Sequence, residues 1–277
     1  MGALVYVVLA LNWSKINIFK LNFGDYMNKI LISLLILTLG VAACSGEKKE
    51  TKETNTDSLP EIAAVPVTFL PVEATASFPD AILELSRPLG NQVFKPGKVP
   101  FEFNVKNFAL QKSTSAAPNL LMILNGGDPE GYYAPIFQRE LTRGTYRTVA
   151  YLVDAQGLAL KNFGNYIDRD FLVGDSRPFP YSAEPYLAVN LPRNEQILPL
   201  GEELLVDFLV LGGDLKLDGL KIKISINSHV TEVTELTPLR VANLPVGDYQ
   251  VKVQLLRVDN KELEGPFSSS TKTVFVR

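Results

Sequence analysis

The segment NGGDPEGYY, residues 125–133, gathers the side chains best suited to contact a ligand. Tyr132 and Tyr133 offer flat aromatic faces, which stack on sugar rings. The carboxylates of Asp128 and Glu130 can accept hydrogen bonds from hydroxyl groups beside them. The alternative is a turn built from Gly-Gly-Asp-Pro, with the two tyrosines pointing to opposite faces of the next strand. The candidate ligand-binding residues are therefore Asp128, Glu130, Tyr132 and Tyr133.

A second group of acids lies in NYIDRDFLVGDSRP, where Asp168, Asp170 and Asp175 follow one another closely. Calcium takes about six to eight oxygen ligands, so a calcium site is one interpretation. Three acids interrupted by Arg169 fall short of that pattern, and ion pairing on a strand surface is simpler. We predict no metal site.

Side chains for catalysis are scarce. His229 is the only histidine, and it follows KIKISIN with Ser225 and Ser228 nearby. Nothing in this spacing brings a nucleophile, a base and an orienting group together. The chain also lacks a Gly-rich phosphate loop and an H-E-x-x-H motif. We interpret His229 as an exposed turn residue, and we predict no enzyme activity and no cofactor.

Cys44, the only cysteine, stands at the end of ILISLLILTLGVAAC, which begins at Ile30 and follows Lys29. The apolar run is too short to span a hydrocarbon core of ~30 Å, and its basic start and small-residue end are typical of a secretion signal. The four residues VAAC resemble the bacterial lipobox, where a peptidase cuts before a lipidated cysteine. We predict that Cys44 carries a lipid; a core cysteine and a retained membrane helix are the alternatives.

Residues 1–43 are therefore predicted to be a signal or leader. Met27 is a more natural start than Met1, because MNKILISLLILTLG is a compact signal by itself. Residues 1–26 then arise from the choice of start site, the alternative being a genuine long leader with two apolar patches.

A tether is expected after Cys44. Charges of both signs alternate along SGEKKETKETNTDS, and such a segment buries too little apolar surface to offset its ordering entropy. Prolines between residues 59 and 79 then favour an extended, semi-stiff chain. We predict a disordered, lipid-anchored linker over residues 44–79 that holds a folded body off a membrane. The expected location is the cell envelope, at the outer membrane, on its periplasmic or surface face.

The composition describes a folded chain. Of 277 residues, 46% are hydrophobic and 21% charged, which suits one large domain or two ordinary ones. The net charge of -3 provides no broad basic field, so nucleic acid is not an expected partner. With 18 Pro and 19 Gly among many Val, Leu, Phe and Tyr residues, strands joined by turns are favoured over helices.

The body of the chain repeats itself. The matched residues, 103 or 104 positions apart, are Pro88 and Pro192, Gly97 and Gly201, Gly144 and Gly247, and Tyr146 and Tyr249. Near-constant offsets across several motifs indicate a duplication. A second Gly-Gly-Asp at residues 212–214 lies outside this offset, so the loop at 125–133 is not duplicated.

Each copy contains about seven short strands with period-two alternation, which favours an immunoglobulin-like β-sandwich. We predict two such domains in tandem, over residues 80–177 and 178–277. Tyr146 and Tyr249 each follow a Gly-x turn before the penultimate strand, where a tyrosine corner would lie; simple core packing is the alternative.

A family resemblance is carried by NLLMILNGG…LTRGTYRTVAYLVDAQGLALKN and by LLVDFLVLGGDL…KIKISIN…LPVGDYQVKVQLLRVDNKELEGPF. These blocks resemble two-domain envelope lipoproteins of the Bacteroidetes type, which often carry the label of phosphopeptide-binding protein. The resemblance covers most of residues 80–277 and implies tandem immunoglobulin-like repeats. The family pattern has histidines where this chain has Leu120, Met122 and Tyr146. It therefore implies no histidine-borne ligand or metal site here.

The sequence thus predicts an all-β, non-enzymatic, lipid-anchored envelope protein that acts in binding or assembly. Its expected partners are a membrane, through Cys44, and an envelope protein, peptide or glycan. The alternative is a phosphopeptide or glycan recognition module, which requires clustered Arg with backbone donors or an exposed aromatic platform. An enzyme would require a deep pocket with a perturbed acid or base.

Overall fold

The computed structural model describes residues 65–73 and 77–277, all within one compact unit, Ile62–Arg277. The described residues form strands and turns without a helix. The alternation of buried and less buried residues explains why the chain forms strands rather than helices. Along β4 (Gly97–Lys106), for example, Val99, Phe101 and Phe103 are buried and the residues between them are not. The predicted all-β class is confirmed.

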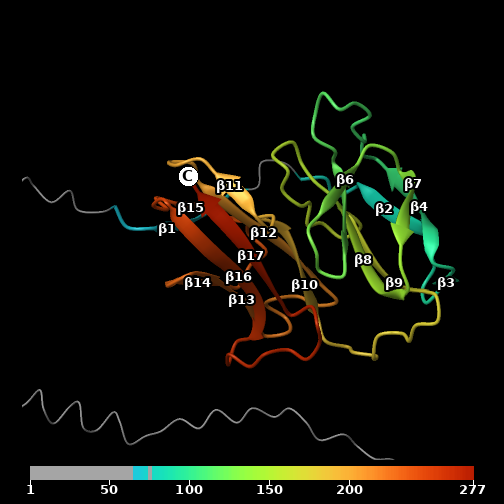
Figure 1. Cartoon of the computed structure of the whole chain (residues 1–277). Helices are drawn as coiled ribbons and strands as arrows, with labels where there is room; N and C mark the ends of the chain where they lie inside the picture. The colour runs from blue at the N-terminus through green and yellow to red at the C-terminus, as the bar shows by residue number, and fades with distance from the viewer. Residues whose placement is uncertain (1–64, 74–76) are drawn as a thin grey trace, which may run out of the picture. The chain divides into compact units, whose positions relative to one another are not determined.

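Strands β2 to β9 make the first sandwich (Figure 1). One sheet has the order β2 (Ile82–Arg87), β4, β7 (Ile136–Leu141). The other has the order β3 (Val93–Phe94), β9 (Tyr166–Val173), β8 (Gly144–Leu152), β5 (Leu120–Leu124), β6 (Glu130–Tyr132). All pairs are antiparallel except β3 with β9.

Strands β10 to β17 repeat this arrangement. One sheet contains β15 (Leu239–Ala242), β12 (Leu204–Leu211) and β10 (Tyr186–Leu191). The other has the order β11 (Gln196–Leu198), β17 (Ser269–Val276), β16 (Gly247–Arg257), β13 (Leu220–Ile226), β14 (His229–Val233). Both sandwiches thus have an A-B-E sheet facing an A′-G-F-C-C′ sheet, so the predicted immunoglobulin-like fold is confirmed.

Each sandwich has its own core between its two sheets. In the first, Phe101 of one sheet meets Phe171 of the other, with ring centroids 5.8 Å apart. In the second, Phe208 belongs to the same buried cluster as Ile222 and Val251 of the facing sheet. Burial of these apolar side chains, at roughly 25 cal/mol per Å², is the main force that holds the sheets together.

The tyrosine corner is present in both copies. The Tyr146 hydroxyl donates to the carbonyl oxygen of Thr142, and the Tyr249 hydroxyl donates to that of Pro245, each at 2.9 Å. Both rings also belong to the cores. The two interpretations of these tyrosines therefore hold together, because the ring packs inward while the hydroxyl fixes the turn before the strand.

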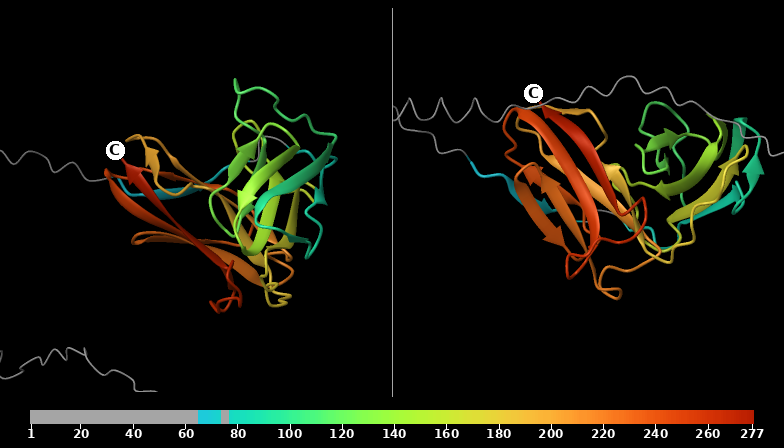
Figure 2. Two further views of the ribbon diagram at one scale, coloured as in Figure 1. Left: turned by 45° about the vertical axis from the view of Figure 1, so that its right-hand side comes forward. Right: turned by 60° about the horizontal axis from the view of Figure 1, so that its bottom comes forward.

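The predicted linker is wrong at one point, because part of it forms a strand. Residues 68–71, placed by the sequence in the disordered linker, form β1 (Thr68–Pro71), which pairs antiparallel with β15 of the second sandwich. In Figures 1 and 2 this strand, drawn in cyan, lies with the orange and red strands rather than with the green ones. The hydrophobic effect explains this pairing, because the side chains of Val67 and Phe69 pack against the second core. In addition, the Val72 amide donates a hydrogen bond to the carbonyl oxygen of Pro238 at 2.8 Å. The chain therefore completes an edge of the second sandwich before it builds the first.

Candidate functional site

Asp128, in the loop between β5 and β6, contacts the second sandwich. Its carboxylate accepts a hydrogen bond from Lys272 Nζ at 2.6 Å and from the Asn194 amide at 3.1 Å. The Lys272 side chain is only 6% exposed, so solvent screens this ion pair little on the lysine side. Burial raises the pKa of Asp128, but the hydrogen bonds from Lys272 and Asn194 outweigh it and hold that pKa below its ordinary value. Asp128 thus joins the two sandwiches.

Glu130 and Tyr132 are held by Arg139 on β7. The Arg139 guanidinium pairs with the Glu130 carboxylate and donates to the Tyr132 hydroxyl, which in turn donates to Glu130 at 3.2 Å. One face of the Tyr132 ring stacks on Phe137, with centroids 3.6 Å apart and planes 7° from parallel. Burial raises the pKa of Tyr132 to about 12. This cluster covers the core at the edge strand β7.

The rest of the candidate loop is a turn. The Tyr133 hydroxyl donates to the carbonyl oxygen of Ala116 at 3.0 Å. Asn125, at a φ of 50°, accepts from the Arg147 amide and donates to the carbonyl of Thr145, which ties the loop to β8. Asn227 makes the matching pair of bonds to β16. The structure does not gather the four candidate residues into one pocket, and a ligand contact at them stays a prediction.

Two of the three acids in residues 168–175 form ion pairs, Asp170 and Asp175. Asp170 receives two hydrogen bonds at 2.7 Å from Arg147, and Asp175 lies 3.6 Å from Arg143. Over residues 65–73 and 77–277, no group of three or more His, Cys, Asp or Glu side chains could hold a metal ion. His229 is the first residue of β14, paired with Ile226 across a hairpin, and it is half-buried. The prediction of an exposed turn residue is therefore wrong, because the turn consists of Asn227 and Ser228, just before it.

Cys44, the predicted lipid site, lies outside the described residues, as do the leader and most of the linker. Among the residues described, no helix is long and apolar enough to cross a membrane. The membrane anchor therefore rests on the sequence.

The two sandwiches share a third apolar core. Its members are Leu121, Ile123, Val149, Tyr151, Val153 and Ala159 of the first sandwich, with Ala188, Leu209 and Leu211 of the second. Apart from Val153 and Ala159, these residues lie on strands that are buried on both faces, such as LLMIL and LLVDFLVL. A continuous apolar run is typical of a strand covered on both sides, and this was the available sequence signal for the contact.

A buried polar network crosses the same contact. The Tyr151 hydroxyl donates to Asn190 at 2.9 Å, and Asn190 donates to Asp207 at 2.7 Å. Asp207 also accepts from the Ala159 amide and from Lys161 Nζ, both at 2.7 Å. Burial and the nearby Asp207 raise the pKa of Tyr151 well above its ordinary value. The side chains of Tyr151, Asn190, Asp207 and Lys161 thus all have hydrogen-bond partners within this network, as buried polar groups require.

Arg147 is a second anchor between the sandwiches. Its guanidinium lies 4.5 Å from the ring centroid of Tyr186, 5.3 Å from that of Phe267 and 5.5 Å from that of Phe179. The hydrogen bonds to Asp170 raise the pKa of Arg147. A cation among three rings gains cation–π attraction while its charge stays neutralised by the carboxylate.

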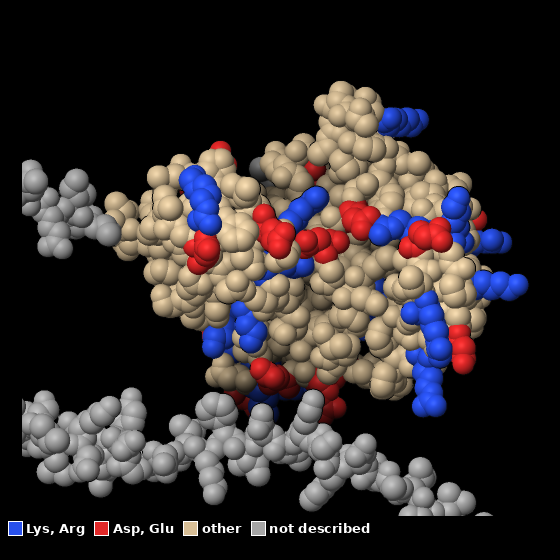
Figure 3. Space-filling model, viewed as in Figure 1, with Lys and Arg blue, Asp and Glu red and all other residues tan. Residues whose placement is uncertain are grey.

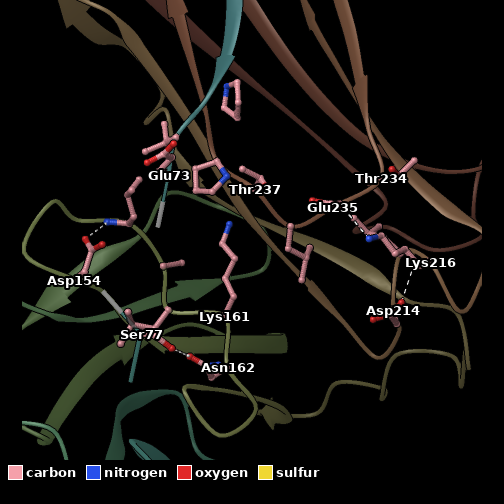
Figure 4. Close-up of a pocket in the computed structure, with 18 residues that line it drawn as sticks. Glu73, Ser77, Asp154, Lys161, Asn162, Asp214, Lys216, Thr234, Glu235 and Thr237 are labelled. Atoms are coloured by element: carbon pink, nitrogen blue, oxygen red, sulfur yellow. Dashed lines mark hydrogen bonds and ion pairs between the residues drawn. The ribbon is translucent and has the colours of Figure 1, made fainter. Parts of the chain in front are cut away.

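A cleft of about 780 Å³ opens beside this contact (Figure 4). Four separate parts of the chain line it: residues 71–73 and Ser77 at and after the end of β1, Asp154 and residues 158–162 between β8 and β9, 214–216 between β12 and β13, and 234–238 between β14 and β15. Both sandwiches and the segment that follows β1 therefore contribute walls. A volume in the range of roughly 300–1,000 Å³ is typical of ligand sites.

The cleft has an apolar base and a charged rim. Leu158, Leu160 and Leu215 line it and are otherwise buried. On the rim, Lys216 pairs with Glu235 at 2.7 Å. Figure 4 shows the Lys161 side chain directed into the space, above the hydrogen-bonded pair of Ser77 and Asn162. The arrangement can bind a ligand that is partly apolar and partly polar.

The nearby surface carries charges of both signs. On the face shown in Figure 3, Lys and Arg side chains lie next to Asp and Glu in several small groups, and most of the surface between the groups is uncharged. The nearly fully exposed apolar side chains are Phe163, Tyr181 and Leu217. Phe163 follows Asn162, and Leu217 follows Lys216, so each comes directly after a residue that lines the cleft.

No family model and no curated protein matches the chain. Solved structures with some likeness include fibronectin(III)-like modules of Clostridium thermocellum CbhA, at 13% identity over 71% of this chain and 94% of that one, with a TM-score of 0.27. Three N-terminal domains of the bacteriophage RB49 outer capsid protein Hoc share 11% identity over 71% and 69%, with a TM-score of 0.20. CBD12 from CALX1.2 shares 10% over 70% and 99%, with a TM-score of 0.18. Because these scores are low, the fold assignment rests on strand order.

Proposed function

We propose that this protein is a non-enzymatic binding or assembly protein of the cell envelope, held at the outer membrane by a lipid on Cys44. The observation that carries the proposal is the cleft between the two sandwiches, which combines an apolar base with a charged rim. Its loops come from both sandwiches, whose relative placement is supported by the shared core and by the network around Asp207. A site held by packed elements is suited to recognition.

Support for the anchor comes from the sequence VAAC at residues 41–44, followed by a polar, charged stretch. We expect the protein to fractionate with membranes and to incorporate a radiolabelled fatty acid. Cys44→Ala should abolish the label, because the thiol that carries the lipid is gone, and the leader should stay attached, because the cut before the lipidated cysteine is lost. If the Ala variant still incorporates the fatty acid, or if the unchanged protein incorporates none, the anchor proposal fails.

Binding can be tested in cells by photo-crosslinking from the rim of the cleft. Phe163 is 96% exposed and Tyr181 is 95% exposed, so both accept p-benzoylphenylalanine without loss of core packing. We expect a discrete adduct from position 163 and none from position 181, since only the first lies beside the cleft. Equal labelling at both positions, or none at either, would argue against a partner at this cleft.

A further inference from the structure

We infer that the cleft binds an extended peptide in which an apolar side chain stands next to a basic one, an inference that rests on the proposed binding function. The peptide would belong to a partner protein of the envelope. The apolar side chain would enter the base of the cleft, and the basic one would lie against its rim.

The base of the cleft offers apolar surface to an incoming side chain. Leu158 and Leu160 project from the segment after β8, Leu215 from the loop after β12, and Leu236 from the loop before β15. Leu158, Leu160 and Leu215 are at most 5% exposed, so the loops that present them are well packed. An aliphatic or aromatic side chain placed here would gain burial without requiring the site to form first.

The rim has an excess of negative charge. Lys216 is neutralised by Glu235, and Lys161 is neutralised by the buried Asp207. Three further carboxylates line the cleft without an ion pair to any described cation: Glu73, Asp154 and Asp214. Because the lining acids outnumber the lining bases, a cationic group on the ligand is favoured and an anionic one is repelled.

The three acids are not equivalent. Asp154 and Asp214 accept hydrogen bonds from backbone amides of their own loops, which fixes their positions. Glu73 makes no hydrogen bond or ion pair to any described residue, and it is exposed beside β1. Glu73 is therefore the carboxylate best placed to turn toward an incoming Lys or Arg.

Two exposed apolar residues extend the surface beyond the cleft. Phe163 is 96% exposed and Leu217 is 88% exposed, one from each sandwich. Large apolar side chains left in water at the borders of a concave site are typical of protein interaction surfaces. They favour an extended peptide longer than one residue over a small molecule.

Other ligand classes fit less well. None of the side chains that line the cleft is aromatic, so it has no platform on which a sugar ring could stack. A phosphopeptide would place two negative charges near Glu73, Asp154 and Asp214, whereas phosphate sites gather Arg and backbone donors. A basic and apolar peptide meets both parts of the site.

The experiment is an array of acetylated heptapeptides with one varied apolar position and one varied neighbour, probed with the lipid-free protein carrying Cys44→Ala. We expect enrichment of Leu or Phe next to Lys or Arg. In solution, by fluorescence polarisation of the best member, replacing its basic residue with Glu should weaken binding at least tenfold at low salt. That difference should shrink at high salt, because exposed charges are screened.

Matched variants locate the site. Glu73→Gln should weaken binding several-fold while Glu264→Gln, at another exposed glutamate, should not; Phe163→Ser should weaken it while Tyr181→Ser should not. All four positions are exposed, so folding can be confirmed for each by circular dichroism. Enrichment of acidic or phosphorylated peptides, a glycan bound in the cleft, or no peptide bound would overturn the inference. An adduct from position 163 in cells would then still support the proposed function, whereas loss of both results would refute both.

Discussion

Replacing Asp207 with Ala should strongly destabilise the protein. Asp207 is fully buried and accepts three hydrogen bonds at 2.7 Å, from Ala159, Lys161 and Asn190. Removing one partner of a buried ion pair costs about 3–5 kcal/mol, and an unsatisfied buried amide costs roughly 1–3 kcal/mol, although the two penalties overlap. Lys161 is 17% exposed and can be solvated through the cleft. We therefore expect a loss of about 3–4 kcal/mol, toward the lower end of the ion-pair range.

The measurement is urea unfolding followed by far-UV circular dichroism and by tyrosine fluorescence, whose coincidence tests for a single transition. Asp207→Asn, which keeps one acceptor oxygen and the side-chain volume, should lose roughly half as much. The control is Asp248→Ala, which breaks an exposed pair with Arg277 and should cost below about 1 kcal/mol. If Asp207→Ala costs no more than Asp248→Ala, the network does not join the sandwiches as described.

Three further changes have defined outcomes. Asp128→Asn should flatten the curve of unfolding free energy against pH on the acid side: the pKa of Asp128 lies below its ordinary 3.8, so its pairing with Lys272 stabilises the fold above that value and is lost as pH falls through the folded pKa. Tyr249→Phe should cost about 0.5–1.5 kcal/mol in urea unfolding, because the bond to Pro245 is lost while the ring stays packed; no loss would leave the corner without energetic weight. Phe69→Ala should lower the melting temperature of the protein, since its ring packs on the second core, and an unchanged value would mean that β1 adds nothing.

Most strands could be predicted because period-two alternation is a local property of the sequence. Val99, Phe101 and Phe103 recur at every second position, and this period of two alone places one face of β4 in a core. The fold class follows from the number and spacing of such strands. The turn at residues 125–133 was also readable, since Asn125 precedes two glycines at the end of an apolar run.

The role of the candidate residues could not be read in the same way. Asp128 and Lys272 are 144 positions apart, and no local pattern indicates that they meet. Tyr132 was a candidate because an aromatic next to acids suits a sugar, but its ring lies on Phe137 of the opposite sheet. The same residue types, acids beside aromatics, can bind a ligand or cover the exposed edge of a sheet. Only the packing of the folded chain shows which of the two they do.

The sequence alone determined the strands and the repeat, because alternation and a constant repeat offset are local properties of the chain. It also predicts a lipid site at Cys44, from a short motif at the end of an apolar run. Only the tertiary structure decided that β1 pairs with β15, that Asp207 is buried, and that four segments between residues 71 and 238 form one cleft. The physical reason is that alternation specifies which face of a strand is apolar but not what covers it. Which segment covers each apolar face, and which strand pairs with each edge, is settled only when both sandwiches pack.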